Sequence, residues 1–595
     1  MLSFLVTGPI ILAVLVYLLP SDKAAKAVAI PGQLALACAS VYLFTICKRE
    51  EIVVFVGGFN PVMGITLKAD TLASVFVLLV SFIFLIVSLY NLGEDDTKLS
   101  WFFLYIWQGL LNGIFLSRDM FNLFILLEIV TVVVSVMIMF NRDKRSMYDG
   151  VYYLMVNTVA IQFYLLGMGY LYKLTGTLDM DIAAKAVSQL DPSSLLLPYA
   201  LIMTTISMKC ALSPLFGWLP KAHGAPGAPS AVSAILSGLH IKSGIYLFIR
   251  FRHVFSAVHP DEFFLVIGII TGIAGFILSL AQSDIKLILA YSTISQIGII
   301  MTGLSLNNSY SYIGAVYHIV NHALFKSALF LSAGLISHTY HTREIDNVRG
   351  VFRRTPILGA ATILAILGIT GAPFFNGSVS KYFIASGAGR LVSGLLMFNN
   401  LGTITIFIKY SATLFGRHPA GHREDARLID DTNAYGAANA RDDTNAYVDT
   451  NAYADTNLRA DTTAYGDANA RVDTTAYTSD KKAGRAVSAR QQVAILIPAL
   501  LCFITGLSGQ RVIHVLFNVS VGIDAAGYLK KALIFFGSVA VGLVIYTSFI
   551  RNGAPFRRDG LFARVKSFSI GFRGMCALTG AYFAILLIVA SVMIK

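Results

Sequence analysis

The chain is 595 residues long, and 56% of these residues are hydrophobic while only 13% are charged, with a formal net charge of +13. A soluble core could not bury so much apolar sequence, so the composition predicts an all-α polytopic membrane protein. The basic residues are spread over short stretches between apolar runs, which argues against nucleic acid as a partner.

Apolar runs long enough to cross a lipid bilayer recur from one end of the chain to the other. We predict about sixteen spans, near residues 2–20, 25–47, 69–92, 101–117, 119–140, 148–172, 195–219, 228–250, 261–281, 286–304, 311–337, 355–385, 391–415, 491–510, 530–549 and 576–594. The first run has no basic leader and is predicted to be a helix rather than a secretion signal. Basic residues favour one set of alternate loops, so the positive-inside rule predicts that this set is cytoplasmic and the N-terminus is outside.

A lone carboxylate, Glu128, lies in the middle of the fifth run, with no other charge within several residues. One interpretation is a fixed ion pair with a lysine that holds two helices together. The other is a titrating group, because two lysines, Lys209 and Lys242, are also predicted inside the membrane and one carboxylate cannot pair with both. A lysine that moves between these environments would take up or release a proton.

Two predicted spans are interrupted by a proline motif with a lysine close by. The first interruption is KCALSPLFGWLP, which begins at Lys209, and the second is GAPFFNGSVSK, which ends at Lys381. A lysine at the depth of a bilayer costs about 2.5 to 3.5 kcal/mol, and unwound backbone there must line a cavity or be covered by protein. A pair of such interruptions is typical of a transport site built from repeats.

A histidine pair and a lysine follow one face of the eleventh predicted span, at His318, His322 and Lys326. Without an acidic or cysteine ligand nearby, the pair is half a zinc site at most, so a proton relay is the favoured interpretation, with helix–helix hydrogen bonding as the alternative. Lys286 lies at a predicted helix end, where it could belong to the same path or extend its side chain to the membrane surface.

No metal or cofactor site is predicted in this chain. The five cysteines lack the spacing of disulfide, zinc or iron–sulfur motifs, and neither a nucleotide-binding glycine motif nor a P-loop is present.

A six-residue repeat of the type DTNAYG occupies residues 431–478. A hexapeptide period can mark a β-helix, but these hexads offer mainly Ala and Tyr for a core. The composition favours a solvated cytoplasmic loop, and an ordered docking element is the alternative.

Five motifs in order resemble the antiporter-like subunits of respiratory complex I, membrane-bound hydrogenases and multi-subunit Na+/H+ antiporters. The resemblance covers about residues 50–415 and is carried by the Lys209 motif, IKSGIY around Lys242, DIKLILAYSTISQIG from Asp284, YHIVNHALFK from Tyr317 and the Lys381 motif. It implies a core of about fourteen helices with two inverted five-helix repeats, each with one discontinuous helix, and about two additional C-terminal helices.

The resemblance also implies an arrangement of regions and of residue roles. The expected regions are N-terminal helices in 1–100, a first repeat in 101–252, a second repeat in 261–415, a hexad-repeat loop in 417–490 and C-terminal helices in 491–595. The expected proton or ion pathway consists of Glu128, Lys209, Lys242, Lys286, His318, His322, Lys326 and Lys381. Glu128 would couple it to a neighbouring subunit.

The expected function is translocation of H+, or exchange of Na+ for H+, within a complex I-like or hydrogenase-like complex in the plasma membrane rather than a mitochondrial membrane. Redox cofactors, such as iron–sulfur clusters, a NiFe centre or a flavin, would lie on partner subunits. The alternatives are a subunit of a redox-independent Na+/H+ antiporter and an inert membrane scaffold.

Overall fold

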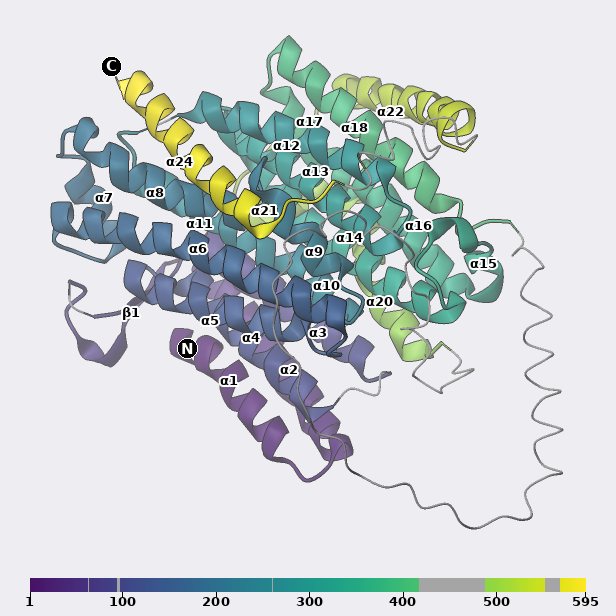
Figure 1. Ribbon diagram of the computed structural model, residues 1–595, viewed down its shortest axis with the longest axis horizontal. Coiled ribbons are helices and arrows are strands. Elements are labelled where there is room, and N and C mark those ends of the chain that lie inside the picture. Colours follow the sequence, from purple (N-terminus) through teal and green to yellow (C-terminus); the bar gives the residue numbers. More distant parts are fainter. Residues whose placement is uncertain are drawn as a thin grey trace, which may run out of the picture. The chain divides into compact units, whose positions relative to one another are not determined.

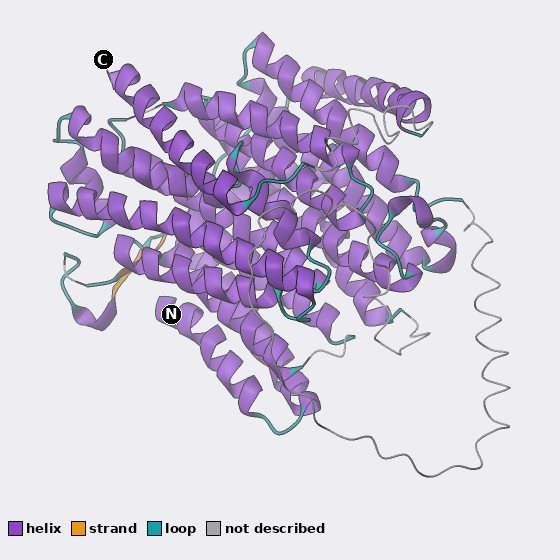
Figure 2. Ribbon diagram, in the orientation of Figure 1, coloured by secondary structure: helices purple, strands orange, loops and turns teal. Residues whose placement is uncertain are grey.

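The computed structural model describes residues 1–62, 64–93, 97–258, 260–416, 487–551, 565 and 568–594. In these ranges the chain is built almost entirely of helices, with one short β-hairpin (Figure 1, Figure 2). The hexad repeat at 431–478 lies outside the described residues.

The N-terminal part of the chain forms four helices and the hairpin. Their bounds are α1 (Leu2–Leu18), α2 (Asp22–Cys47), β1 (Ile52–Phe55), β2 (Thr66–Ala69), α3 (Thr71–Asn91) and α4 (Lys98–Leu116). The strands are antiparallel, with Ile52 opposite Ala69 and Phe55 opposite Thr66.

The middle of the chain contains the first interrupted span. The elements are α5 (Met120–Ile138), α6 (Lys144–Thr175), α7 (Met180–Val187), α8 (Pro192–Lys209), the 3₁₀ turn η2 (Leu215–Gly217), α9 (Trp218–Gly224), α10 (Ser230–Ile235), the π-helical turn η3 (Leu236–His240) and α11 (Ile241–Val254).

The second interrupted span and the C-terminal helices follow. Their bounds are α12 (Asp261–Ala281), α13 (Ile285–Ser305), α14 (Ser309–Tyr340), η4 (Ile345–Asn347), α15 (Val351–Arg354), α16 (Pro356–Thr370), α17 (Asn376–Ser386), α18 (Arg390–Ser411), α20 (Ala489–Leu507), α21 (Gly509–Phe517), α22 (Ala525–Ile545), the π-helical turn η7 (Tyr546–Ile550) and α24 (Phe572–Ile594).

The predicted spans are confirmed. Among the described residues, 13 helices are long and apolar enough to cross a membrane, with α10, η3 and α11 counted together. The interrupted α8 and the shorter apolar helices α1 and α16 complete the predicted set. The chain is therefore a multi-pass membrane protein.

Aspartates fix the beginnings of many of these helices. The side chain of Asp70 caps α3, that of Asp119 caps α5 and that of Asp284 caps α13, each by accepting backbone N–H bonds of the first turn. A carboxylate at this position satisfies free donors and interacts favourably with the helix dipole. These charges lie at the ends of apolar segments, where water or cationic side chains can reach them.

Two parts of the chain repeat the same construction in opposite directions. Asp119 forms an isolated antiparallel bridge with Asp179 where α5 begins, and Asp284 forms one with Glu344 where α13 begins. The helix α11 finishes on the side of the bundle where the first bridge lies. From there α12 crosses to the opposite side. The helix α13 therefore starts on the side where α5 finishes. This is the inverted arrangement that the fold class predicts, although the residue boundaries of the two repeats stay a prediction.

The two ends of the bundle can be named by their residues. The hairpin end contains β1, β2 and the beginnings of α3 and α5, and the Arg343 end contains Arg343 and the beginnings of α6 and α13.

The last two long helices pack on different parts of the bundle: α22 lies along α18, and α24 lies along α8 and α6 (Figure 1).

Candidate functional site

The first interrupted span leaves Lys209 at the end of a helix inside the bundle. The loop after α8 contains Ala211 at a φ of +52°, a conformation that a non-glycine residue adopts only when its surroundings require it. Trp218 Nε1 donates to Met208 O at 2.9 Å, and the same carbonyl accepts from Ala211 N at 2.9 Å, so the end of α8 is held by two hydrogen bonds. Lys209 is 3% exposed, and its Nζ donates to Thr131 Oγ1 on α5 at 2.9 Å.

The second interrupted span places Lys381 in a corresponding setting. Phe374, in the loop between α16 and α17, has a φ of +69°. Lys381 Nζ donates to Ile369 O at 2.6 Å and to Asn400 Oδ1 at 2.7 Å. The lysine itself therefore satisfies a carbonyl freed at the end of α16, so its position depends on the interruption.

Lys242 lies directly after a π-helical turn that the sequence did not reveal. This turn, η3, widens the helix between α10 and α11, a distortion that is often found at functional sites. Lys242 is fully buried, and its Nζ hydrogen-bonds to Ser237 O within the turn and contacts His322 Nδ1 on α14 at 2.5 Å. On the same turn, His240 Nε2 is 3.0 Å from the hydroxyl of Tyr153.

The predicted face of α14 is buried, and its side chains contact α11, α13 and α17. His318 Nδ1 lies 2.8 Å from Ser380 Oγ on α17, and its Nε2 lies 3.1 Å from Gln296 Oε1 on α13. Lys326 Nζ donates to Leu289 O at 2.8 Å, also on α13. We refer to Lys242, His322, His318, Ser380 and Lys381 as the central row.

The central row brings four of the eight predicted pathway residues together. Lys242 contacts His322, His318 is one helical turn away, and Ser380 is the chain neighbour of Lys381. Lys209 stands apart from this row, because its Nζ bonds to Thr131 rather than to a member of the row.

Glu128 lies at the margin of the bundle rather than inside it. It is half-buried, and its neighbours Ile125, Ile129 and Val132 on the same side of α5 are exposed. Among the described residues, no ion pair joins Glu128 to a lysine. Both interpretations of Glu128, a fixed ion pair and a titrating group, stay predictions.

Lys286 does not extend to the membrane surface. It is 5% exposed, and its Nζ donates to Ala228 O at 2.9 Å at the Arg343 end. The cap of its helix, Asp284, is held by the guanidinium of Arg343 at 2.8 Å. Lys286 is therefore a buried lysine, and its side chain does not extend to the membrane surface as one of the two interpretations held.

One buried histidine was missed by the sequence reasoning. His223 on α9 is fully buried and stacks on Phe330 at 4.6 Å, and within the described part of the chain neither of its ring nitrogens has a hydrogen-bond partner. Lys326 Nζ lies 5.9 Å from the same phenyl ring. His223 lies three residues after the end of the Lys209 motif, and nothing in the sequence there indicated that its nitrogens would be buried and unpaired.

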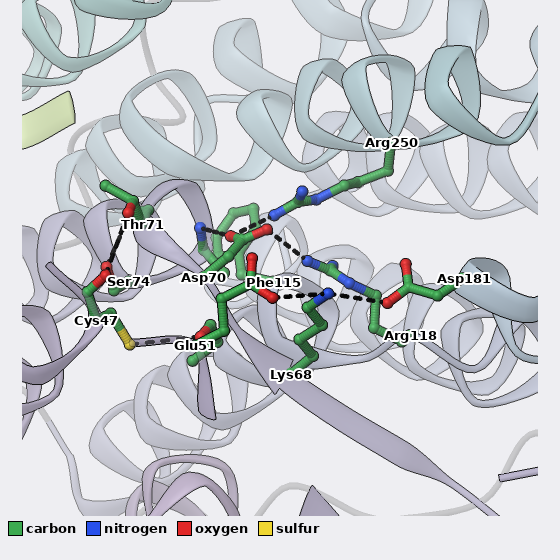
Figure 3. A network of polar contacts seen from close by, with 12 residues as sticks. Cys47, Glu51, Lys68, Asp70, Thr71, Ser74, Phe115, Arg118, Asp181 and Arg250 are labelled. Carbon is green, nitrogen blue, oxygen red and sulfur yellow. Dashed lines mark hydrogen bonds and ion pairs between the residues drawn. The ribbon is translucent and has the colours of Figure 1, made fainter. Parts of the chain in front are cut away.

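Charged groups at the hairpin end form a network that ties α3, α5 and α11 together (Figure 3). Asp70 accepts from Arg118 at 2.9 Å and from Arg250 at 2.6 Å, and Lys68 pairs with Glu51 and with Asp181, each at 3.0 Å. Burial by itself would raise the pKa of Asp70, but the guanidiniums of Arg250 and Arg118 outweigh it and lower that pKa to about 2. The carboxylate therefore stays charged and holds both arginines.

The acidic, histidine and cysteine side chains of the described residues form no cluster of three or more that could hold a metal ion. The predicted pathway residues are lysines, two histidines and one glutamate, all of which can take up or release a proton.

The sequence is similar to that of known membrane subunits. The profile of the family described as "NADH:quinone oxidoreductase/Mrp antiporter, TM" matches residues 117–408. "NADH-quinone oxidoreductase subunit N" of Desulforudis audaxviator (strain MP104C) is 33% identical over 403 residues, which cover 65% of this chain and 78% of that protein. The chain belongs to this family.

A further relative is similar in sequence, and a solved structure is similar in fold. A Na(+)/H(+) antiporter subunit of Bacillus subtilis (strain 168) is 31% identical over 341 residues, covering 56% of this chain and 68% of that protein. A chain in the "Structure of Mrp complex from Dietzia sp. DQ12-45-1b" has the same fold, with a TM-score of 0.72, 20% identity and coverage of 90% of this chain and 99% of that one. The family segment 117–408 contains every predicted pathway residue and ends before α20, α22 and α24.

Proposed function

We propose that this chain is an ion-translocating membrane subunit of a multi-subunit complex, and that it moves H+ or exchanges Na+ for H+ along the predicted pathway. The observation that carries the proposal is the central row, in which buried Lys242, His322, His318 and Ser380 lead to the partly buried Lys381. Ionisable groups inside a membrane are costly and are typical of ion pathways.

The chemistry of the row supports proton transfer. Imidazole can accept a proton on one nitrogen and donate from the other, and a buried lysine can hold a proton or pass it to a hydrogen-bonded neighbour. Lys209, Lys286 and Glu128 are proposed as groups through which protons enter or leave the row, since they belong to the same helix bundle. Interrupted helices would admit the water that joins them.

Two sources of energy are compatible with the family. In a complex similar to that of the NADH-quinone oxidoreductase relative, electron transfer would occur on partner subunits that carry iron–sulfur clusters, a flavin or a NiFe centre. In an assembly similar to that of the antiporter relative, a pre-existing ion gradient would supply the energy. Transport that requires Na+ in the purified complex, without any bound redox subunit, would favour the second candidate.

The proposed location is the bacterial-type plasma membrane, with the N-terminus outside and other membrane subunits of the complex beside the chain. Arg142, Arg343 and Arg354 all lie at the Arg343 end, opposite Lys68 and Arg250. The excess of basic residues at the Arg343 end supports a cytoplasmic position for it.

Two substitutions test the proposal in the intact complex in membrane vesicles. Lys209→Ala and Glu128→Gln should each lower ion translocation on the order of a hundredfold, the typical effect of losing a proton-transfer group, while the complex still assembles. Lys144→Ala, which removes an exposed lysine at the beginning of α6, is the matched control. Wild-type rates in both variants would instead support an inert scaffold.

A further inference from the structure

The two C-terminal helices α22 and α24 lie beyond the segment that the family profile matches, yet each places a tyrosine hydroxyl on one interrupted span. Tyr582 on α24 lies 3.0 Å from Ser207 Oγ, near the end of α8. Tyr528 on α22 accepts a hydrogen bond from Phe374 N at 3.0 Å, between α16 and α17.

At the first interruption the contact is buried and directional. Tyr582 is 2% exposed, and Ser207 Oγ already donates to Met203 O at 2.7 Å, so the tyrosine hydroxyl is the donor to Ser207. Ser207 precedes Lys209 by two residues in the last turn of α8. The same helix also covers the far side of the interruption, because a Cβ on Gly217 would lie 3.0 Å from Met575 Sδ.

At the second interruption the hydroxyl holds a residue with a strained backbone. Phe374 has a φ of +69°, is 60% exposed and gives its N–H to Tyr528. Ser378 Oγ, in the first turn of α17, lies 2.8 Å from the same hydroxyl. Lys531, also on α22, donates to Tyr382 O at 2.9 Å, and Tyr382 directly follows Lys381.

Packing against the bundle alone does not account for this arrangement. The apolar side chains of α22 and α24 would suffice to place two helices in a bilayer beside α18 and α8 (Figure 1). Both tyrosine hydroxyls, however, bind a residue beside an interruption: Tyr582 donates to the side chain of Ser207 in the last turn of α8, and Tyr528 accepts the backbone N–H of Phe374 before α17.

We propose that Tyr582 and Tyr528 are positioning residues, through which the two C-terminal helices fix the two interrupted segments that carry Lys209 and Lys381. This inference rests on the proposed function for its consequence in transport. The hydroxyls touch neither lysine and act through Ser207 in one case and through Phe374 and Ser378 in the other.

Two native cysteines report on the two interruptions separately. Cys210 directly follows Lys209 and is fully buried. Cys502 on α20 is also fully buried, and its Sγ would lie 3.4 Å from a Cβ on Gly368, near the end of α16. A local opening at either interruption would expose the thiol beside it, so the reaction of each thiol with N-ethylmaleimide measures that opening.

The experiment compares Tyr582→Phe and Tyr528→Phe in the complete complex in vesicles, with labelling quantified at each cysteine by peptide mass spectrometry. Tyr582→Phe should speed labelling of Cys210 about fivefold and leave Cys502 unchanged, as expected for the loss of one net hydrogen bond. Tyr528→Phe should do the reverse. Unchanged labelling at both thiols, or equal increases at both, would overturn the proposal.

Matched controls distinguish the effect of losing the hydroxyl from the effects of losing the ring and of general destabilisation. Tyr546→Phe removes a hydroxyl from the end of α22 that has no hydrogen bond within the described residues, and Phe583→Leu removes the ring that packs on Phe163 beside Tyr582. Neither should change the labelling of Cys210 or Cys502. If either control matched the tyrosine variants, the effect would belong to packing and the positioning role would be rejected.

Transport measured on the same vesicles gives the second readout. Each tyrosine variant should lower the maximal rate of ion translocation about fivefold, with the amount of complex and the half-saturating ion concentration unchanged, because the hydroxyls do not touch the ion. If Lys209→Ala and Glu128→Gln both transport like the wild type, the proposed function fails whatever the labelling shows. If Lys209→Ala is inactive but labelling and maximal rate do not respond to the tyrosine variants, only this inference fails.

Discussion

His322 joins the two lysine-bearing parts of the central row. Its Nδ1 contacts Lys242, and it shares a helix face with His318 one turn earlier. Within the described residues its Nε2 has no hydrogen-bond partner, although it is fully buried. An imidazole with one nitrogen engaged and the other unpaired can accept a proton on one side and release it on the other.

We expect His322→Gln to reduce ion translocation on the order of a hundredfold, because the amide can hydrogen-bond to Lys242 but cannot carry a proton between two nitrogens. His338→Gln, an exposed position on the same helix, is the control. Flux in vesicles measures both variants. A rate for His322→Gln equal to that of the control would remove His322 from the pathway.

Asp70 gives a residue-scale prediction for stability. Its pKa is lowered from an ordinary value of 3.8 to about 2, so its stabilising effect is complete above pH 4 and is lost as the pH falls towards 2. Asp70→Asn should therefore cost on the order of 2 kcal/mol at pH 7, and the difference from the wild type should shrink below pH 4. Thermal unfolding of the purified complex at several pH values tests this sign. A difference that grows in acid would contradict it.

At the scale of the elements, proline and glycine motifs predicted both interruptions, because they stop a helix and a lysine beside them must be compensated. The π-helical turn before Lys242 could not be predicted, since Leu236, Ser237 and Leu239 fit a regular helix equally well. The hairpin was also missed. Its strands of four residues lie in a short connection between two spans, where hydropathy carries little information.

For the candidate site, the sequence predicted residue types and spacing but not partners. The common face of His318, His322 and Lys326 follows from their spacing along a helix. The contact of Lys242 with His322 depends on how α11 packs on α14, and the outward position of Glu128 depends on which side of α5 lacks a neighbour. Such pairings arise from tertiary packing and leave no local signal.

Close packing of α11 against the end of α8 leads to a prediction about Gly244. A Cβ at this position would lie 2.9 Å from both Cys210 N and the carbonyl carbon of Lys209, so α8 or α11 would have to shift. We expect Gly244→Ala to lower ion translocation at least about tenfold, since a displacement of about 1 Å can cost more than that. Gly169→Ala in α6, where a Cβ meets nothing within 4 Å, should transport normally.

Flux and the amount of assembled complex are measured together for these two glycine variants. Normal flux in Gly244→Ala would mean that the end of α8 can move without consequence for Lys209. An equal loss in Gly169→Ala would show that the glycine substitutions act on folding in general.

At the scale of the whole molecule, the inverted arrangement means that the two interrupted spans enter the bundle from opposite ends. The helix before the first interruption starts at the hairpin end, and the helix before the second starts at the Arg343 end. Lys209 ends the helix that comes from the hairpin end, and Lys381 lies on α17, directly beyond the helix that comes from the Arg343 end. The central row lies between the two interruptions, so an ion pathway could open alternately towards either side of the membrane.

The hexad repeat provides the last prediction, at residues 431–478. These residues lie between α18 and α20, beyond the family segment 117–408, and contain none of the predicted pathway groups. Deleting 431–478 should therefore leave ion translocation and the labelling of Cys210 at wild-type values, because the shortened connection still retains 417–430 and 479–486. Replacing 431–478 by a Gly/Ser sequence of equal length controls for the length of the connection. If both variants failed to assemble, the repeat would be a docking element for a partner subunit; if only the deletion failed, its length would be what the complex requires.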